Sequence, residues 1–395
     1  MDQIINWKEE IRMYRSNIIW RIAFSIFGLL VLIDGAIAAE PLKVGGMFAL
    51  SGSYAQVGIG QKNTGLYVID EVNAAGGIKG RKINFIQADT EGDPTKALVA
   101  AKRLIEQEKV SVIIGPVRTD EGMAIKPYID SAKVPTVMHC ASDIIVDTPP
   151  AYWVFKTPPR SSHVVQRLFI YMKAHGLKNL GFLYAQTGFG KDALRLVQKF
   201  APEYGINIVG IESFGDGDVD MKPQLLNLRG KDPQAILIWT VGPSGSIVAK
   251  NMRELDYRVP QFQGHGSATL DFIKIAGPAA EGTMIVAQKI LIGDDLPDSD
   301  PQKRPIIKFL HDYTKKYAVP GVMESCGADA SHIVVEALKK AGDNPAAIRD
   351  AIENTRGFIG LNGTYNMSPS DHNGLSYKDL VLIKVQGGRY RLVKD

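Results

Sequence analysis

Arg118, Thr119 and Asp120 are three adjacent side chains whose types could do chemistry together. They follow the run VSVIIGP (110–116), in which β-favouring apolar residues lead into a glycine. Such a run predicts a strand buried on both faces, and the polar residues then occupy the loop at its carboxyl end, where open α/β sheets bind ligands. A cation, a hydroxyl and a carboxylate at that place could hold a reacting substrate, a cofactor phosphate, or a ligand that is only bound and released.

Two glycine-rich stretches could bind phosphate groups. The stretch GGIKG (76–80) follows a predicted helix and lacks the Lys-Ser/Thr pair of a phosphate loop, so it indicates a helix end before a strand. The stretch GFGKDA (188–193) follows a predicted strand, opens a helix and precedes Glu212 by roughly twenty residues, which matches part of a dinucleotide fingerprint. An exported nucleotide-dependent oxidoreductase is therefore the enzymatic alternative, and it predicts nicotinamide binding that is lost in Gly190→Val.

The remaining residues of catalytic type form no motif. The seven histidines show no metal-ligand spacing, and Ser267 in GHGSA (264–268) stands at the wrong position for a nucleophile elbow. A triad assembled from distant positions stays open as a hypothesis, because such groups need not be close in sequence. We expect no catalytic residue, no metal ion and no cofactor.

Length and composition predict a two-domain globular protein. A chain of 395 residues is too long for one ordinary core, and its 45% hydrophobic and 22% charged residues are typical of globular proteins. The net charge of +4 is spread along the chain without a basic block, so nothing supports nucleic-acid binding. The two cysteines, Cys140 and Cys326, cannot form a disulfide framework, and nothing in the sequence supports a bridge between them.

The first 39 residues have the pattern of a cleavable secretory signal peptide. Basic residues precede the apolar run 22–33, and the Ala-Ile-Ala of 36–38 supplies a small-residue cleavage site. A membrane anchor is the alternative, but the run ends at Asp34 and falls short of the roughly 20 residues needed to span a bilayer. We therefore expect export to the periplasm.

From Leu42 onward, strand-like and helix-like patterns alternate. This order predicts an α/β fold with parallel, doubly wound sheets covered by helices on both faces. A second round of the same alternation begins after Pro158 and Pro159, so we expect two similar lobes. The last stretch, 374–393, alternates like a β-hairpin with Gly387 and Gly388 at its turn.

Four stretches together resemble a known family. They are LSGSYAQVGIGQKNTGLYVIDEVNAAGGIKGRKI (50–83), ADTEGDPTKALVAAKRLI (88–105), VSVIIGP (110–116) and NLGFLYAQTGFGKD (179–192). In this order they are similar to the leucine/isoleucine/valine-binding proteins, the type I periplasmic solute receptors of ABC transporters. VNAAGGIKGRKI and the Asp-x-x-x-Asp-Pro that follows it are the most specific parts, and the similarity extends from Leu42 to the carboxyl end.

The resemblance implies two Rossmann-like lobes that close on a ligand between them, joined by three crossovers near 156–160, 284–289 and 358–368. It implies an amino-terminal lobe of 42–157 plus 288–360 and a carboxyl-terminal lobe of 160–285 plus 361–395, after a signal peptide of 1–39. The implied partners are a small carboxylate ligand and the ABC permease subunits in the inner membrane. We expect a monomer. A receptor of the same fold that reports its ligand to a regulator stays open.

Ligand-binding positions follow from the resemblance residue by residue. Thr119 falls where the family has a hydroxyl that holds the ligand carboxylate, and Cys140, Ala141 and Ser142 match the loop that completes this grip. Tyr54 lies in the loop after the first strand. Helix amino termini at the strand ends suit a carboxylate on physical grounds as well. Plain helix capping is the alternative role for the two hydroxyls, and a buried apolar role is the alternative for the thiol.

The second lobe departs from the amino-acid-binding pattern. Phe189 replaces a cleft tyrosine, and His265 and Gly266 stand where amino-acid-binding members have an acidic residue for the ligand ammonium. A buried ammonium without a counter-charge would cost several kcal/mol. Asp120 or Glu121 could substitute for the missing acid, or the ligand lacks an amino group.

These alternatives lead to a hypothesis about the ligand. We expect it to keep a carboxylate and to place an aromatic or other apolar body against Phe189, Tyr54 or Trp239. Arg118 has two readings, a direct ion pair with an anionic ligand or a place on the rim of the cleft, where ion pairs are worth little.

Overall fold

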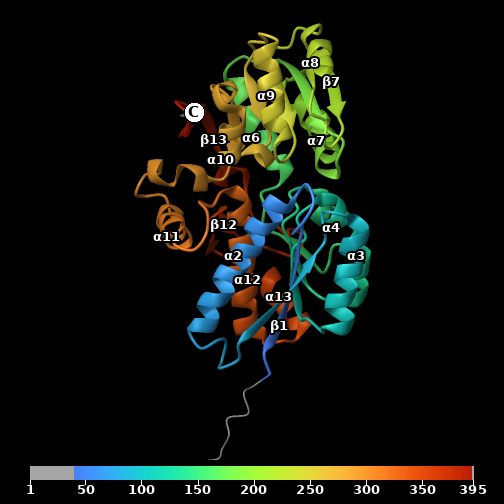
Figure 1. Cartoon of the computed structure of the whole chain (residues 1–395), viewed down its shortest axis with the longest axis vertical. Helices are drawn as coiled ribbons and strands as arrows, with labels where there is room; N and C mark the ends of the chain where they lie inside the picture. The colour runs from blue at the N-terminus through green and yellow to red at the C-terminus, as the bar shows by residue number, and fades with distance from the viewer. Residues whose placement is uncertain (1–39, 394–395) are drawn as a thin grey trace, which may run out of the picture. The chain divides into compact units, whose positions relative to one another are not determined.

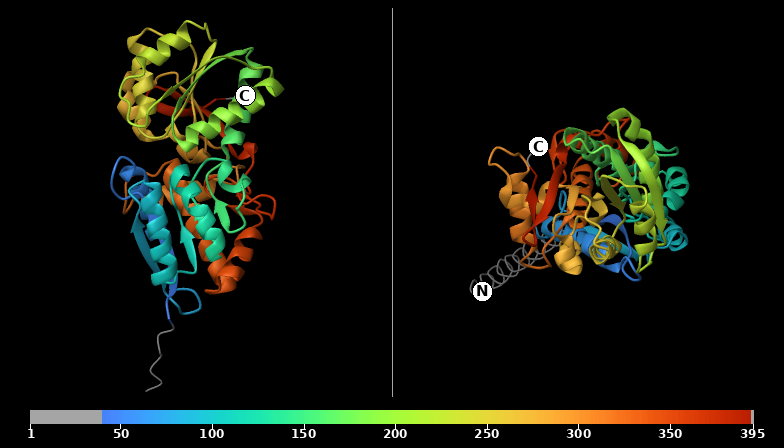
Figure 2. Two further views of the ribbon diagram at one scale, coloured as in Figure 1. Left: turned by 90° about the vertical axis from the view of Figure 1, so that its right-hand side faces the viewer. Right: turned by 90° about the horizontal axis from the view of Figure 1, so that it is seen from above.

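The computed structural model describes residues 40–393, so the expected signal peptide lies outside the described residues. Two large sheets organise this part of the chain, one of five strands and one of seven. We call each sheet with its covering helices a lobe. Figure 2 shows helices packed on both faces of the sheets, which is the doubly wound α/β arrangement that the alternating pattern predicts.

The first lobe contains a sheet of parallel strands in the order β2-β1-β3-β4-β5. These strands are β1 (Leu42–Phe48), β2 (Ile83–Asp89), β3 (Val112–Ile114), β4 (Thr136–Met138) and β5 (Val154–Lys156). Its helical elements are α2 (Ala55–Ala74), α3 (Pro94–Lys102), the π-helical η1 (Arg103–Gln107), α4 (Thr119–Ala132), α5 (Ile144–Asp147), α11 (Lys303–Tyr313), α12 (Val322–Ala341) and α13 (Pro345–Glu353). Helices α2, α12 and α13 pack together on one face, and α3 and α4 cover the other (Figure 1).

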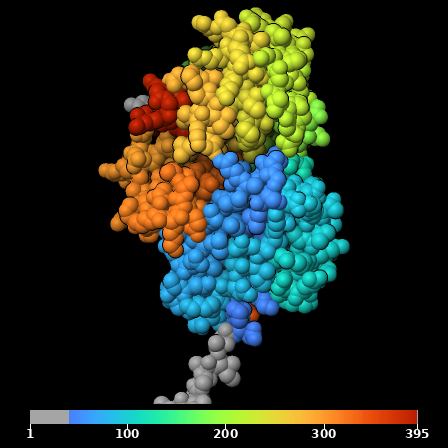
Figure 3. Space-filling model, in the orientation of Figure 1, coloured from blue at the N-terminus to red at the C-terminus, as the bar shows by residue number. Residues whose placement is uncertain are grey.

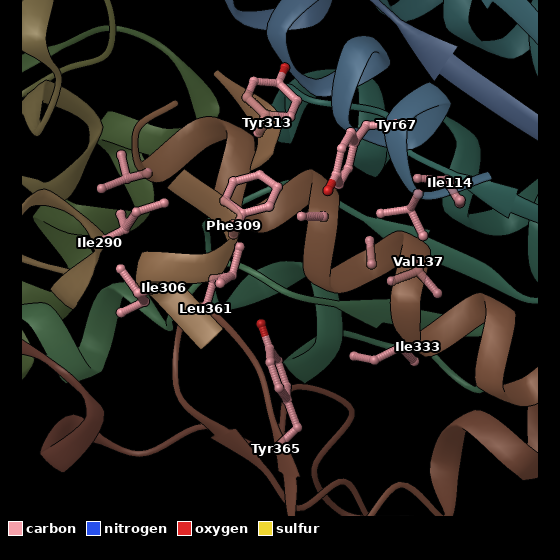
Figure 4. Close-up of a cluster of buried hydrophobic side chains, with 14 of the residues drawn as sticks. Tyr67, Ile114, Val137, Ile290, Ile306, Phe309, Tyr313, Ile333, Leu361 and Tyr365 are labelled. Atoms are coloured by element: carbon pink, nitrogen blue, oxygen red, sulfur yellow. The ribbon is translucent and has the colours of Figure 1, made fainter. Parts of the chain in front are cut away.

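Full burial of β3 explains its continuous apolar run. Val112 and Ile114 point into the core under α2 and α12, whereas Ile113 joins the core under α3 and α4. Figure 4 shows Ile114 in the first of these cores, together with a cluster of rings from α2 and α11. In that cluster the Tyr67 ring lies 5.5 Å from the ring of Tyr313.

The second lobe contains a mixed sheet in the order β14-β13-β10-β9-β8-β6-β7. These strands are β6 (Asn179–Ala185), β7 (Asn207–Phe214), β8 (Ala235–Trp239), β9 (Gln261–Gln263), β10 (Met284–Ala287), β13 (Val381–Gln386) and β14 (Arg389–Leu392). Its helical elements are α6 (Ser161–Ala174), α7 (Gly188–Tyr204), α8 (Lys222–Arg229), α9 (Ser244–Glu254), α10 (Leu270–Ala276), η2 (His265–Ser267), η3 (Gly277–Ala280) and η5 (Tyr377–Asp379).

Positive backbone dihedrals explain two of the glycine pairs. Gly76 and Gly77 have φ of +105° and +81° directly after α2, so the expected helix end is confirmed. Gly387 and Gly388 have φ of +60° and +71° and form the turn between β13 and β14, so the expected hairpin is confirmed too. Its first strand also pairs antiparallel with β10 and thereby extends the sheet.

The chain passes between the lobes three times: after β5, after β10 through η4 (Lys289–Asp295), and after α13 through the small ribbon of β11 (Phe358–Ile359) and β12 (Thr364–Tyr365). The first and third passages are bonded to each other. The Tyr365 hydroxyl donates to the carbonyl of Thr157 at 2.8 Å, and Asn373 Nδ2 donates to the carbonyl of Pro158 at 2.9 Å. The exact residue boundaries given above for the lobes stay a prediction.

Among residues 40–393, no helix has both the length and the apolar character needed to cross a bilayer.

Candidate functional site

A cavity lies between the lobes at the carboxyl ends of both sheets. The space between its lining atoms is about 650 Å³, part of which is open solvent. Its walls come from the loops after β1, β3, β4, β5, β6, β8, β9 and β10 and from the start of α12: Tyr54, Val57, Val117, Arg118, Thr119, Asp120, His139, Ala141, Pro158, Thr187, Phe189, Val241, His265, Gly266, Gln288, Val322, Met323 and Cys326.

Most of the predicted site residues lie on this wall: Tyr54, Arg118, Thr119, Ala141, Phe189, His265 and Gly266. Cys140 and Ser142 do not line the cavity and are fully buried behind it. Trp239 is also fully buried and does not line the cavity, although the apolar part of the ligand was expected against it. Whether the lining residues contact a ligand stays a prediction.

Thr119 is the first residue of α4, at the carboxyl end of β3. Its Oγ1 donates to Ser142 Oγ at 3.0 Å and caps no backbone group of its own helix. The capping role belongs to Glu121, whose Oε2 accepts from the backbone N–H of Arg118 at 2.9 Å. Burial raises the pKa of this Glu121 carboxyl. The two predicted hydroxyls therefore form one pair, with Thr119 in front and Ser142 behind.

Arg118 bridges the two lobes at the rim of the cavity. Its Nη2 lies 2.9 Å from Asp216 Oδ2 in the loop after β7, and its guanidinium stacks on the Tyr54 ring at 4.0 Å. The Tyr54 hydroxyl donates to the same Asp216 carboxylate at 3.3 Å. The positive charge of Arg118 is thus paired with a carboxylate of the protein itself. This pairing favours a place on the rim of the cavity over a direct ion pair with a ligand.

A second contact also joins the two lobes: the side-chain amide of Gln56 in the first lobe donates a hydrogen bond to the carboxylate of Asp271 in α10. Figure 3 shows the segment after β1 (blue) in contact with the second lobe (yellow) along this edge.

Asp120 joins the lobes at the start of α7. Its Oδ1 and Oδ2 accept from the backbone N–H of Gly188 at 3.1 and 3.2 Å, and it lies 3.8 Å from the Arg118 guanidinium. Thr187 Oγ1 accepts from the N–H of Gly190 at 3.2 Å and caps the same helix. The amino end of α7, where the glycine fingerprint would place a pyrophosphate, is therefore already occupied by a carboxylate of the protein. This arrangement argues against the dinucleotide-binding alternative.

The second lobe contributes an aromatic wall. The Phe189 ring lies 5.4 Å from the ring of Trp239 and 5.3 Å from the ring of His265, which it meets edge-on. A Cβ atom on Gly266 would lie 2.4 Å from the carbonyl oxygen of Thr240, so no side chain fits there. Burial lowers the pKa of His265 to about 3, so its imidazole is neutral at neutral pH.

The cavity is also lined by four polar residues that the sequence reasoning did not single out: His139, Thr187, Gln288 and Cys326. His139 and Gln288 directly follow β4 and β10, so the rule that ligands bind at strand carboxyl ends could have found them. Nothing in the local sequence marks Cys326, which lies within α12.

The loop between β4 and α5 is held from behind by a buried lysine. Lys156 Nζ donates to the carbonyl of Ala141 at 2.6 Å, and burial lowers the pKa of Lys156 to about 8. Cys140 Sγ lies 3.0 Å from the carbonyl oxygen of Arg118. Cys140 and Cys326 are both free, buried thiols, and burial raises the pKa of each. Lys156 and the Cys140 thiol thus hold in place the loop between β4 and α5, which contains the predicted residues Cys140 and Ser142.

Comparisons with known proteins agree with this architecture. The family model described as "Periplasmic binding protein" matches residues 41–389. The chain is 21% identical to Leu/Ile/Val-binding protein homolog 3 of Brucella melitensis, over 89% of this chain and 93% of that one. It is 20% identical to the leucine-, isoleucine-, valine-, threonine-, and alanine-binding protein of Pseudomonas aeruginosa, over 80% of this chain and 83% of that one.

Solved structures show the same fold. An extracellular ligand-binding receptor from Rhodopseudomonas palustris HaA2 is 27% identical and superposes with a TM-score of 0.83, over 89% of this chain and 99% of that one. LivJ from Streptococcus pneumoniae, solved with isoleucine, is 23% identical and has a TM-score of 0.78, over 90% of this chain and all of that one. The predicted two-lobed fold and the resemblance to the leucine/isoleucine/valine-binding proteins are confirmed, and the chain belongs to the periplasmic binding protein family.

Proposed function

We propose that this protein is the extracytoplasmic substrate-binding component of an ABC importer of the branched-chain amino acid type. It captures a small carboxylate-bearing ligand in the cavity between its lobes and releases it chemically unchanged. The observation that carries the proposal is the composition of the cavity wall, whose residues come from both lobes. At the rim of the cavity, the Arg118–Asp216 and Asp120–Gly188 contacts join the two lobes. Opening of the lobes would break these contacts and divide the site in two.

The carboxylate of the ligand binds at the amino end of α4 and at Thr119, whose hydroxyl turns from Ser142 to donate to it. Thr119 lines the cavity and is only 4% exposed, and the first N–H groups of α4 present a partial positive charge beside it. Ala141 lines the cavity on the neighbouring loop. Arg118 holds the two lobes together and does not bind the ligand, because its charge is paired with Asp216 of the second lobe.

Binding without chemistry is supported by the partners of the reactive side chains. Among the described lining residues, no hydroxyl or thiol is hydrogen-bonded to either histidine: His139 contacts Gln61, and the Thr119 hydroxyl donates to Ser142. A serine-, threonine- or cysteine-type nucleophile would need a base within hydrogen-bond reach.

The family description "Periplasmic binding protein" and the signal-like pattern before residue 40 support a place in the periplasm. LivJ, whose title calls it a branched-chain amino acid transporter substrate binding protein, supports permease subunits of the inner membrane as partners. We propose that the protein acts there as a monomer.

A thermal-shift screen of the purified protein against small carboxylic acids and amino acids tests the proposal. A true ligand at about 100 times its dissociation constant adds about 2.7 kcal/mol to the free energy of unfolding and raises the Tm accordingly. Mass spectrometry of the bound compound should recover it unchanged. The proposal is wrong if no small acid or amino acid shifts the Tm, or if incubation with the protein converts the compound into a product.

A further inference from the structure

Three residues on the cavity wall carry polar side-chain atoms that have no hydrogen-bond partner within residues 40–393. These atoms are His139 Nε2, Gln288 Oε1 and both ring nitrogens of His265. The atoms are themselves buried, and the three residues are 4%, 1% and 4% exposed. Leaving a buried polar group unpaired costs free energy, and a ligand that pairs such a group recovers that cost.

The hydrogen-bonding role of His139 Nε2 follows from its neighbour. Burial lowers the pKa of His139 to about 3, so the ring is neutral at neutral pH. Its Nδ1 lies 2.9 Å from Gln61 Oε1, which can only accept, and the single ring proton therefore sits on Nδ1. Nε2 is left with a free lone pair and acts as an acceptor.

Gln288 presents an acceptor as well. Its Nε2 donates to Cys326 Sγ at 3.7 Å, which orients the amide and leaves Oε1 without a partner among the described residues. His139 and Gln288 of the cavity wall thus each hold a neutral acceptor that no residue of 40–393 satisfies, and a donor on a ligand would pair with either.

Among the described lining residues, no carboxylate is free to balance a positively charged donor on the ligand. Asp120 is the one carboxylate among the described lining residues, and it is already held by the Gly188 N–H and lies near Arg118. Glu121 does not line the cavity, and one of its oxygens caps the backbone of Arg118. A ligand ammonium buried between neutral acceptors would keep an uncompensated charge, whereas a hydroxyl would not.

We propose, building on the proposed function, that the ligand is a hydroxylated carboxylic acid without an ammonium group, whose hydroxyl donates its one proton to His139 Nε2 or Gln288 Oε1 and whose apolar body packs on Phe189. In this account the two acceptors select the hydroxyl, and the absence of a free acid beside them disfavours α-amino acids. His139 and Gln288 are thus specificity-determining residues.

Matched probe series test the proposal by calorimetric titration. One series is leucine, 2-hydroxy-4-methylpentanoate and 4-methylpentanoate, which differ only in ammonium, hydroxyl or hydrogen at one carbon. A second is phenylalanine, 3-phenyllactate and 3-phenylpropionate, and a third pair is 4-hydroxybenzoate and benzoate. We expect the hydroxylated member to bind at least tenfold tighter than its counterparts in at least one series, because a site built to bond a hydroxyl rejects analogues that lack it.

The outcomes separate this inference from the proposed function. If the ammonium members bind tightest, or the unsubstituted acids bind as tightly as the hydroxylated ones, the inference is wrong and the solute-binding function stands. If no member of any series binds, the inference is wrong, and the solute-binding function stands as long as another acid or amino acid in the thermal-shift screen raises the Tm.

Two variants at one position locate the effect. Gln288→Leu removes the acceptor, and we expect it to reduce the preference for the hydroxylated member over the unsubstituted acid at least tenfold. Gln288→Glu supplies a negative charge in nearly the same shape, and we expect it to raise the affinity for leucine or phenylalanine relative to the hydroxy acid at least tenfold. The exposed Gln107→Leu is the matched control and should change neither ratio. Unchanged ratios in both folded Gln288 variants would overturn the assignment.

Discussion

Arg118 Nη2 of the first lobe lies 2.9 Å from Asp216 Oδ2 of the second lobe, across the rim of the cavity. The two residues are 98 positions apart in the chain and meet because the lobes approach each other there. The Tyr54 ring stacks under the guanidinium and its hydroxyl donates to the same carboxylate. The three side chains form a clasp across the rim of the cavity.

The clasp predicts that Asp216→Asn and Arg118→Ala weaken ligand binding by similar, modest factors. Partly exposed ion pairs contribute about 0.2–1 kcal/mol, so we expect the dissociation constant of a bound acid to rise by a factor of about 1.4 to 5 in each variant. The double variant should cost less than the sum of the two single variants, because both remove one interaction. If Arg118 instead held the ligand directly, Arg118→Ala would cost tenfold or more while Asp216→Asn would cost little. Calorimetric titration of the three variants distinguishes these patterns.

Thr119→Ala should lower affinity for the carboxylate about tenfold, since it removes a hydroxyl from the proposed site and leaves Ser142 without its partner. Thr119→Ser keeps the hydroxyl and should retain most of the affinity. The exposed Thr314→Ala is the control for a generic effect of removing a threonine hydroxyl. Equal affinity in Thr119→Ala and the unmodified protein would contradict the placement of the carboxylate.

The buried His265 predicts acid sensitivity. Its pKa is about 3 in the folded protein, below the 6.5 of an unperturbed histidine, so between these values the unfolded chain binds a proton that the folded chain does not. The free energy of unfolding therefore falls as the pH drops through this range. At pH 5 the contribution is about 1–2 kcal/mol, and His265→Gln should remove that part of the pH dependence. Urea unfolding of both proteins at pH 5.0 and 7.5 measures the difference, and an equal loss on acidification in both would contradict the prediction.

Gly190→Ala should destabilise the second lobe whether or not a ligand is present. A Cβ atom at this position would lie 1.9 Å from the carbonyl oxygen of Ala185, so β6 and α7 would have to move apart. We expect a loss of about 1–3 kcal/mol in the free energy of unfolding. Gly230→Ala is the matched control, because its backbone is helical and its Cβ would have room. A neutral Gly190→Ala would contradict a packing role.

The sequence predicts those features that depend on local patterns. The buried run before Gly115, the glycine pairs at 76–77 and 387–388 and the alternation of strands and helices led to the correct fold. They also placed Thr119 and Phe189 at strand ends, where the cavity lies.

Features that depend on side-chain direction or on the approach of two lobes could not be predicted. Cys140 and Ser142 occupy the expected loop, but their side chains turn into the core. Asp216 became visible as a partner of Arg118 only in three dimensions, since no local pattern links two loops on different sheets. The acceptor role of His139 likewise depends on its contact with Gln61 in α2.

A crystal structure of the protein with the tightest-binding hydroxylated acid tests the central claim most directly. We predict that the carboxylate contacts Thr119 Oγ1 and the amino end of α4, that the hydroxyl lies within hydrogen-bond distance of His139 Nε2 or Gln288 Oε1, and that the Arg118–Asp216 pair stays intact. A ligand carboxylate bonded to Arg118 with Asp216 displaced, or a ligand bound outside the cavity between the lobes, would contradict it.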